Sequence, residues 1–140
     1  MKKKIAIITG IYGQDGSYLA EFLIKKKYFV YGITNKRKKI DYFNNYKKNI
    51  KILKININNF KNISNLVKKI KPNEIYHLGS QSYINLNFDS EFFKLNSNIN
   101  GTNFLLGSIK KFSPKTKFYF AGSSEMFGDA KKYPQDENTQ

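Results

Sequence analysis

The chain has 140 residues, of which 40% are hydrophobic, and this is enough for one small domain with a single core. No apolar run approaches the roughly 20 residues that span a bilayer, so we expect a cytoplasmic protein with no membrane partner. The chain has no cysteine, which excludes disulfides and thiolate chemistry, and its single histidine, His77, argues against a metal site.

The net charge of +15 first suggests a nucleic-acid partner. However, 24 of the 25 basic residues are lysine, and the chain also holds 17 asparagines and 17 isoleucines. These three residue types share A/T-rich codons, so a drift in base composition explains the charge without any polyanion. A protein that reads nucleic acid would be expected to use arginine for bidentate contacts. We therefore expect no nucleic-acid partner.

Strands and helices are expected to alternate along the first half of the chain. The β-branched run 4–9 predicts a buried strand, and apolar residues at helical spacing predict a helix over 17–27. Residues 28–33 are expected to form a second strand and residues 50–57 a third. The polar segment 35–49 between them predicts a loop with a short helix.

The second half continues the alternation. Apolar residues recur at i, i+3, i+4 and i+7 from Ile63, which predicts a helix that Pro72 ends. Residues 74–78 predict a fourth strand, a long helix ends near Phe112, and residues 117–121 predict a fifth strand, with loop beyond. The apolar stripe of the long helix is expected at Phe92, Leu95, Ile99, Thr102, Leu106 and Ile109.

This order predicts an α/β fold in which a doubly wound parallel sheet of the Rossmann type carries helices on both faces. Residues 1–140 are expected to form one such domain, which stops after the fifth strand. Ligands of these sheets bind beyond the carboxyl ends of the strands. The informative segments are therefore 10–16, 34–38, 56–57, 78–82 and 122–125.

A glycine loop follows the first strand and opens the first helix. Gly10, Gly13 and Gly16 are spaced G-x-x-G-x-x-G, which differs from the G-x-G-x-x-G of the common dinucleotide fingerprint. Glycines here permit a tight turn and a close approach of backbone to a pyrophosphate, while the helix N-terminus supplies free N–H groups for the anion. The alternative is a helix-starting turn without a ligand.

The residues around this loop resemble a known family. Residues 9–23 are similar to the opening of the extended short-chain dehydrogenase/reductases, and the stretch Gly-Gln-Asp-Gly-Ser-Tyr-Leu-Ala-Glu at 13–21 resembles more specifically the GDP-mannose 4,6-dehydratase family. Three later segments resemble that family in order and spacing. They are Leu78-Gly79-Ser80-Gln81-Ser82, Gly101-Thr102 with Leu105-Leu106, and Ser123-Ser124-Glu125-Met126-Phe127-Gly128.

The resemblance implies a lyase of nucleotide-sugar metabolism that acts on GDP-mannose, on the route to GDP-fucose. It implies that the chain is the N-terminal, NADP-binding part of such an enzyme, which is expected to be a homo-oligomer at full length. The expected cofactor-binding residues are Gly10, Ile11, Tyr12, Gly13, Gln14, Asp15, Gly16, Asn35, Lys36, Arg37, Asn56, Ile57, Leu78, Gly79, Ser80, Gln81, Ser82 and Phe93.

The loop after the second strand favours NADP over NAD. An acidic residue there would hold the ribose diol of NAD, and residues 34–38 contain none. Lys36 and Arg37 instead suit a 2′-phosphate, although a loop of solvated lysines is the simpler alternative. Asn56 stands where the family has an aspartate that contacts adenine, and Phe93 stands where it has a tyrosine.

The resemblance assigns two catalytic residues. Glu125 matches the carboxylate that takes the C5 proton of the sugar, and Ser123 matches the hydroxyl that hydrogen-bonds the C4 oxygen; Glu125 could instead be a structural hydrogen-bond acceptor. The family's Tyr-x-x-x-Lys pair is absent, because none of the ten tyrosines has lysine four residues later. Two alternatives stay open: another extended-family epimerase or reductase, and a non-catalytic nucleotide-binding module, which the missing pair favours. His77 is expected to be a buried structural residue.

Overall fold

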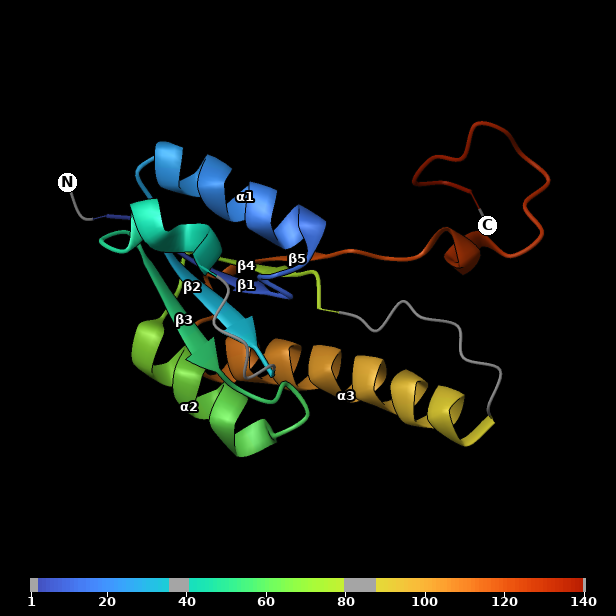
Figure 1. The fold of residues 1–140 in the computed structure, drawn as a ribbon. Helices are drawn as coiled ribbons and strands as arrows, with labels where there is room; N and C mark the ends of the chain where they lie inside the picture. The colour runs from blue at the N-terminus through green and yellow to red at the C-terminus, as the bar shows by residue number, and fades with distance from the viewer. Residues whose placement is uncertain (1–2, 36–40, 80–87, 140) are drawn as a thin grey trace.

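The structure is a computed structural model that describes residues 3–35, 41–79 and 88–139, without the side chains of 41, 42, 44, 88–97, 124 and 125. Figure 1 shows the order of its elements. In chain order they are β1 (Ile5–Thr9), α1 (Gln14–Lys25), β2 (Phe29–Thr34), the 3₁₀ helix η1 (Asp41–Tyr46), β3 (Ile50–Lys54), α2 (Phe60–Ile70), β4 (Glu74–His77), α3 (Phe88–Phe112), β5 (Lys117–Phe120) and the 3₁₀ helix η2 (Ser124–Phe127).

The five strands form one parallel sheet in the order β3-β2-β1-β4-β5. Helix α1 covers one face, and α2 and α3 cover the other (Figure 1). This arrangement confirms the predicted doubly wound, Rossmann-like sheet. From β1 the chain adds β2 and β3 on one side, and it then returns to the other side of β1 to add β4 and β5. The direction in which strands are added therefore reverses between β1 and β4, and the carboxyl ends of these two strands flank this switch point.

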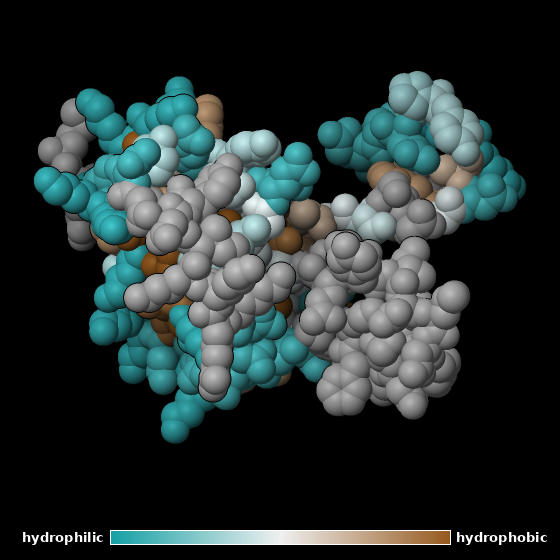
Figure 2. All heavy atoms as spheres, in the orientation of Figure 1, coloured by the Kyte–Doolittle hydropathy of each residue, from teal (hydrophilic) through white to brown (hydrophobic). Residues whose placement is uncertain are grey.

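Two apolar layers hold the sheet, one on each face. Because successive strand residues point to opposite faces, Ile8 packs toward α1 while Ile7 packs toward α2 and α3. The outer surface is mostly hydrophilic over α1 and α2 (Figure 2). The buried layer under α1 comprises Ala6, Ile8, Ile11, Ala20, Leu23, Ile24, Val30, Phe43 and Ile50. The layer under α2 and α3 comprises Ile7, Ile33, Ile63, Leu66, Val67, Ile75, Leu105 and Ile109.

The observed element ends differ from the predicted ones by a few residues. Helix α1 starts at Gln14, three residues before the predicted start, because Gly13 takes the extended conformation of an N-cap. It ends at Lys25, since Lys27 has a left-handed φ of 65°. Strand β3 ends at Lys54, and β4 and β5 end one residue before their predicted ends. Helix η2 lies in a segment that was expected to be loop.

The apolar stripe predicted for α3 is wrong at Ile99 and Leu106 but confirmed at Ile109, which is buried. Ile99 and Leu106 are 56% and 44% exposed. The buried face instead carries small residues, because Gly101 lies against Ile57 and Ser108 hydrogen-bonds Ser64 of α2 at 3.0 Å. Small side chains let the two helices approach closely, and an apolar pattern does not detect them. Among residues 98–112 of α3, those that are buried are Gly101, Leu105, Ser108 and Ile109.

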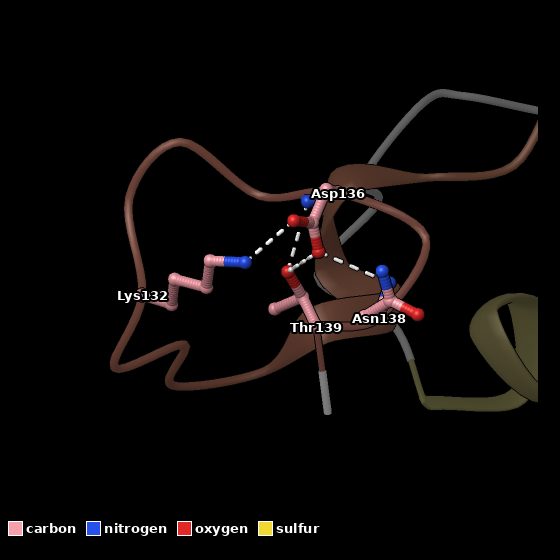
Figure 3. A network of polar contacts seen from close by, with 4 residues as sticks. All are labelled: Lys132, Asp136, Asn138 and Thr139. Atoms are coloured by element: carbon pink, nitrogen blue, oxygen red, sulfur yellow. Dashed lines mark hydrogen bonds and ion pairs between the residues drawn. The ribbon is translucent and has the colours of Figure 1, made fainter.

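The segment after η2 is organised by a single carboxylate. Figure 3 shows Lys132, Asn138 and Thr139 around Asp136, whose Oδ1 accepts from the Asn138 N–H at 3.0 Å and from the Thr139 hydroxyl at 3.1 Å. The Lys132 ammonium donates to Oδ2, and this bond, with the Asn138 N–H, lowers the pKa of Asp136. The segment stands away from the sheet in Figure 1.

Candidate functional site

The carboxyl ends of the five parallel strands meet at one edge of the sheet. The segments that leave this edge are the glycine loop after β1, Asn35 after β2, residues 55–57 after β3, Leu78 and Gly79 after β4, and residues 121–123 after β5. Such an edge is where ligands of doubly wound sheets bind. The structure therefore brings together the described members of the predicted cofactor site.

The glycine loop is a tight turn that leads directly into α1. Gly10 has a left-handed φ of 72°, and the N–H of Gly13 donates to the Gly10 carbonyl at 2.8 Å. Gly13 is the exposed N-cap residue of α1, and since it has no side chain, no capping side chain bonds the first N–H groups of the helix. The first N–H groups of a helix have no partner within the helix, so this end of α1 offers donors and a positive dipole to an anion.

Gly16 and Gly32 serve close packing. A Cβ on Gly16 would lie 2.3 Å from the carbonyl oxygen of Gly10, so only glycine lets α1 start against the loop. A Cβ on Gly32 of β2 would lie 2.5 Å from Ile11 and 2.8 Å from Ile52. Ile11 is fully buried, and its side chain anchors the loop in the apolar layer under α1.

The loop after β4 lies directly against the glycine loop. A Cβ on Gly10 would come within 2.9 Å of the Cα of Gly79, and a Cβ on Gly79 would come within 3.1 Å of the Gly10 nitrogen. Because neither residue has a side chain, the backbones of the two loops lie in direct contact at the carboxyl edge of the sheet. Leu78 is half-buried against the layer under α1.

A buried polar pair, which sequence reasoning did not connect, lies beneath this contact. Thr9 and His77 are partners in the register of β1 and β4, and their Oγ1 and Nδ1 atoms are 2.6 Å apart. The N–H of Gly79 donates to the same Oγ1 at 3.0 Å. Burial lowers the pKa of His77, which is 3% exposed. The histidine is thus buried, as predicted, and it contacts a loop of the site through Thr9.

The other described residues of the predicted site vary in their exposure. Gln14 and Asp15 are exposed in the first turn of α1. Tyr12 stacks on Phe43 of η1 with ring centroids 6.1 Å apart, so its ring belongs to the packing under α1. Asn35 is exposed at the end of β2.

The loop after β3 carries two further predicted residues. The side-chain oxygen of Asn56 accepts from the N–H of Asn58 at 3.0 Å, which shapes the turn and leaves one lone pair for another donor. Ile57 is held by Gly101 of α3, since a Cβ on that glycine would lie 3.0 Å from Ile57. Ile57 is therefore a packing residue at the rim of the site.

Several predicted site residues lie outside the described part of the chain. They are Lys36, Arg37, Ser80, Gln81 and Ser82, together with the side chains of Phe93 and Glu125. The backbone of Phe93 lies in α3 and that of Glu125 in η2. Ser123 is exposed, and its carbonyl accepts from the N–H of Met126 at 3.1 Å, which starts η2.

The arrangement suits an anionic dinucleotide bound along the strand ends. Within residues 3–35, 41–79 and 88–139, no group of three or more His, Asp or Glu side chains could hold a metal ion. None of the described helices is long and apolar enough to cross a bilayer. A separate groove of about 610 Å³ lies between α2 and the sheet, and its lining includes Tyr31, Lys51 and Lys69 but no residue of the glycine loop.

Comparison with known sequences identifies close relatives. The profile of the family described as GDP-mannose 4,6 dehydratase matches residues 7–140. The GDP-mannose 4,6-dehydratase of Vibrio cholerae is 38% identical over 99% of this chain, that of Dictyostelium discoideum 39% over 99%, and that of Homo sapiens 35% over 98%. The chain spans 40%, 42% and 40% of these relatives, about two fifths of their length.

Comparison with solved structures supports the fold. The UDP-glucose 4-epimerase of Bifidobacterium longum, solved in complex with NAD+ and UDP, matches 98% of this chain and 42% of its own with a TM-score of 0.81 at 18% identity. The UDP-N-acetylglucosamine 4-epimerase of Methanobrevibacter ruminantium M1 matches 99% of this chain and 44% of its own with a TM-score of 0.80 at 24% identity. At these identities the likeness concerns the fold alone.

Proposed function

Because this chain belongs to the GDP-mannose 4,6 dehydratase family, we propose that it binds NADP at the carboxyl edge of its sheet and serves in the dehydration of GDP-mannose to GDP-4-keto-6-deoxymannose. In this proposal the chain provides the cofactor-binding part of the enzyme. The activity belongs to a protein with the length of the relatives, of which this chain spans about two fifths.

The observation that carries the cofactor proposal is the contact between the two glycine loops. The Gly10–Gly13 turn presents the N-terminus of α1, and Gly79 lies against it with no side chain on either backbone. A pyrophosphate at the helix N-terminus would meet unpaired N–H donors and the positive end of the helix dipole. The solved epimerase of Bifidobacterium longum, which shares the fold, holds NAD+.

The proposed chemistry uses two residues of this chain beyond the cofactor loops. When bound, NADP supplies the acceptor for the hydride that leaves C4 of the sugar and the donor that returns it to C6. The Ser123 hydroxyl donates a hydrogen bond to the C4 oxygen. The Glu125 carboxylate takes the C5 proton, which the C4 ketone has made acidic, and water then leaves C6. A general base of this kind typically contributes about 10²–10⁴-fold in rate.

The Tyr-x-x-x-Lys pair, which takes the C4 hydroxyl proton in the resembled family, has no match among these 140 residues. A nucleotide-binding module without catalysis is the second candidate function. A chimera that adds the remaining three fifths of the Vibrio cholerae relative separates the two candidates. We expect turnover in the chimera, and we expect Glu125→Gln to keep GDP-mannose binding but to lose about 10²–10⁴-fold in kcat. A chimera that binds both ligands without turnover would favour the module.

The preference for NADP is proposed from residues 34–38, which carry three cations and no acid. Calorimetric titration of the double variant Lys36→Gln/Arg37→Gln should show weaker NADPH binding and nearly unchanged NADH binding, because NADPH alone has the 2′-phosphate. The matched control removes two exposed lysines, Lys47 and Lys48. They precede β3 and so lie near the amino ends of the strands, opposite the proposed cofactor site. Equal losses of NADPH and NADH affinity in the double variant would contradict the preference.

A further inference from the structure

The buried pair beneath the glycine loops has a hydrogen-bond direction that is set by the tautomer of His77. The Oγ1 atom of Thr9 accepts from the Gly79 N–H at 3.0 Å and lies 2.6 Å from Nδ1 of His77. Thr9 is 1% exposed and His77 is 3% exposed, so the bond between them is shielded from bulk solvent. With an unprotonated Nδ1, the Thr9 hydroxyl accepts from the Gly79 N–H and donates to His77, so the hydroxyl has a partner for both its donor and its acceptor roles. The chain of donors then runs from the Gly79 N–H to Thr9 and from Thr9 to His77.

Protonation of the imidazole would reverse one link of this chain. An N–H at Nδ1 would donate to Oγ1, and the hydroxyl hydrogen of Thr9 would need another acceptor in a buried site. The hydroxyl would then hold the Gly79 N–H less well. Because Gly79 lies against Gly10, a change at His77 is transmitted to the contact between the two glycine loops.

The surroundings of the imidazole contain no competing charge in the described residues. Its ring lies 6.3 Å from the ring of Phe118 and 5.8 Å from that of Phe120 on β5. The only ionisable residue of β4 besides Tyr76 and His77 is Glu74, which accepts from Tyr28 on the α1 face of the sheet, whereas His77 faces the other side. The described buried residues of α2 and α3 on the side of His77 are uncharged.

We propose that His77 is a positioning residue for the dinucleotide: through the Thr9 hydroxyl, its unprotonated Nδ1 holds the Gly79 backbone against the glycine loop. This proposal rests on the proposed function, since it concerns the same cofactor site. It adds a residue that touches no ligand and makes cofactor affinity depend on pH.

The test compares variants by calorimetric titration with NADPH and NADH between pH 5 and 8. Thr9→Val removes the hydroxyl at nearly constant volume and should weaken binding by about tenfold, because the Gly79 N–H and Nδ1 of His77 both lose their partner. Thr9→Ser should restore most of the affinity. His77→Asn keeps an acceptor that takes up no proton, so its affinity for NADH should stay constant at the acidic pH where the wild type loses affinity. Because burial lowers the pKa of His77, that loss should begin below the ordinary imidazole pKa of about 6.5. The pH series uses NADH because NADPH carries a 2′-phosphate, whose own protonation in this pH range would also change the affinity.

A matched control separates positioning from stability. Ser64→Ala breaks the buried hydroxyl pair between Ser64 and Ser108, which lies between α2 and α3, and should lower stability without changing affinity. Amide hydrogen exchange adds a measurement that needs no ligand, because the Gly79 amide should exchange faster in Thr9→Val than in Thr9→Ser.

The outcomes distinguish the two proposals. Failure of the wild type to bind either dinucleotide at pH 8 would refute the proposed function, and the positioning role with it. Normal wild-type binding together with unchanged affinity in Thr9→Val, or with the same pH profile in His77→Asn as in the wild type, would refute the positioning role alone.

Discussion

Gly13 and Gly16 are three residues apart in one loop, and the structure predicts opposite effects when they are substituted. A Cβ on Gly13 would meet a single atom, the Gly10 carbonyl oxygen at 3.2 Å, and Gly13 has an ordinary φ of −72°. Gly13→Val should therefore cost only about 1 kcal/mol of stability, mainly from a poorer helix cap. Its side chain would cover the exposed backbone where the pyrophosphate is proposed to bind, so NADPH binding should be lost.

Gly16→Ala should have the reverse effect. Its Cβ would lie 2.3 Å from the Gly10 carbonyl oxygen, 3.0 Å from the Gly10 carbon and 3.1 Å from the Cα of Ile11. All three are backbone atoms, so α1 or the loop must move by close to an ångström. We expect a loss of about 3 kcal/mol, at the upper end of the usual cost of overpacking.

Guanidinium unfolding followed by circular dichroism measures both stabilities, and quenching or enhancement of NADPH fluorescence measures binding to folded protein. The reasoning would be refuted by normal NADPH binding in folded Gly13→Val, which would place the ligand elsewhere. It would also be refuted by a Gly16→Ala variant as stable as the wild type, because the contact with Gly10 would then not exist.

Three further predictions concern the frame of the site. Gly107 is exposed in α3 with nothing within 4 Å of its added Cβ, so Gly107→Ala should stabilise the fold by about 0.5–1 kcal/mol in the same unfolding assay. The side chain of Asn59 caps α2 by accepting from the Asn62 N–H at 3.0 Å, so Asn59→Ala should cost about 1 kcal/mol, whereas the exposed control Asn65→Ala in the same helix should cost nothing. Burial and the hydrogen bond to Glu74 raise the pKa of Tyr76 to about 12, so absorbance titration should show a late-ionising tyrosine that is missing from Tyr76→Phe. Since the unfolded tyrosine ionises near 10, the contribution of Tyr76 to stability should be full below pH 10 and decline from there through pH 12.

The sheet and the glycine loop could be predicted because their signals are local. The run at 5–9 is apolar and β-branched, which suits a strand buried on both faces, and Gly10 directly follows it. The spacing of Gly10, Gly13 and Gly16 indicated a turn into a helix, and the structure shows a specific close contact for the first and the third of these glycines.

The features that could not be predicted depend on partners distant in sequence. The face of α3 is set by Gly101 and Ser108, which fit against Ile57 and Ser64, and neither residue contributes to an apolar stripe. The link between Thr9 and His77 spans 68 positions and exists because β1 and β4 are neighbours in register. The basic loop at Lys36 and Arg37 and the segment from Ser80 to Ser82 lie outside the described residues, so their roles stay predictions.

The central claim, that a dinucleotide binds at the carboxyl edge of the sheet, is tested most directly by mapping amide chemical shifts of ¹⁵N-labelled protein during titration with NADPH. The account predicts the largest shifts at Gly10, at residues 13–16 and at Gly79, the backbone that the two glycine loops present together. Shifts confined to the lysine-bearing groove between α2 and β3, around Lys51 and Lys69, would contradict it.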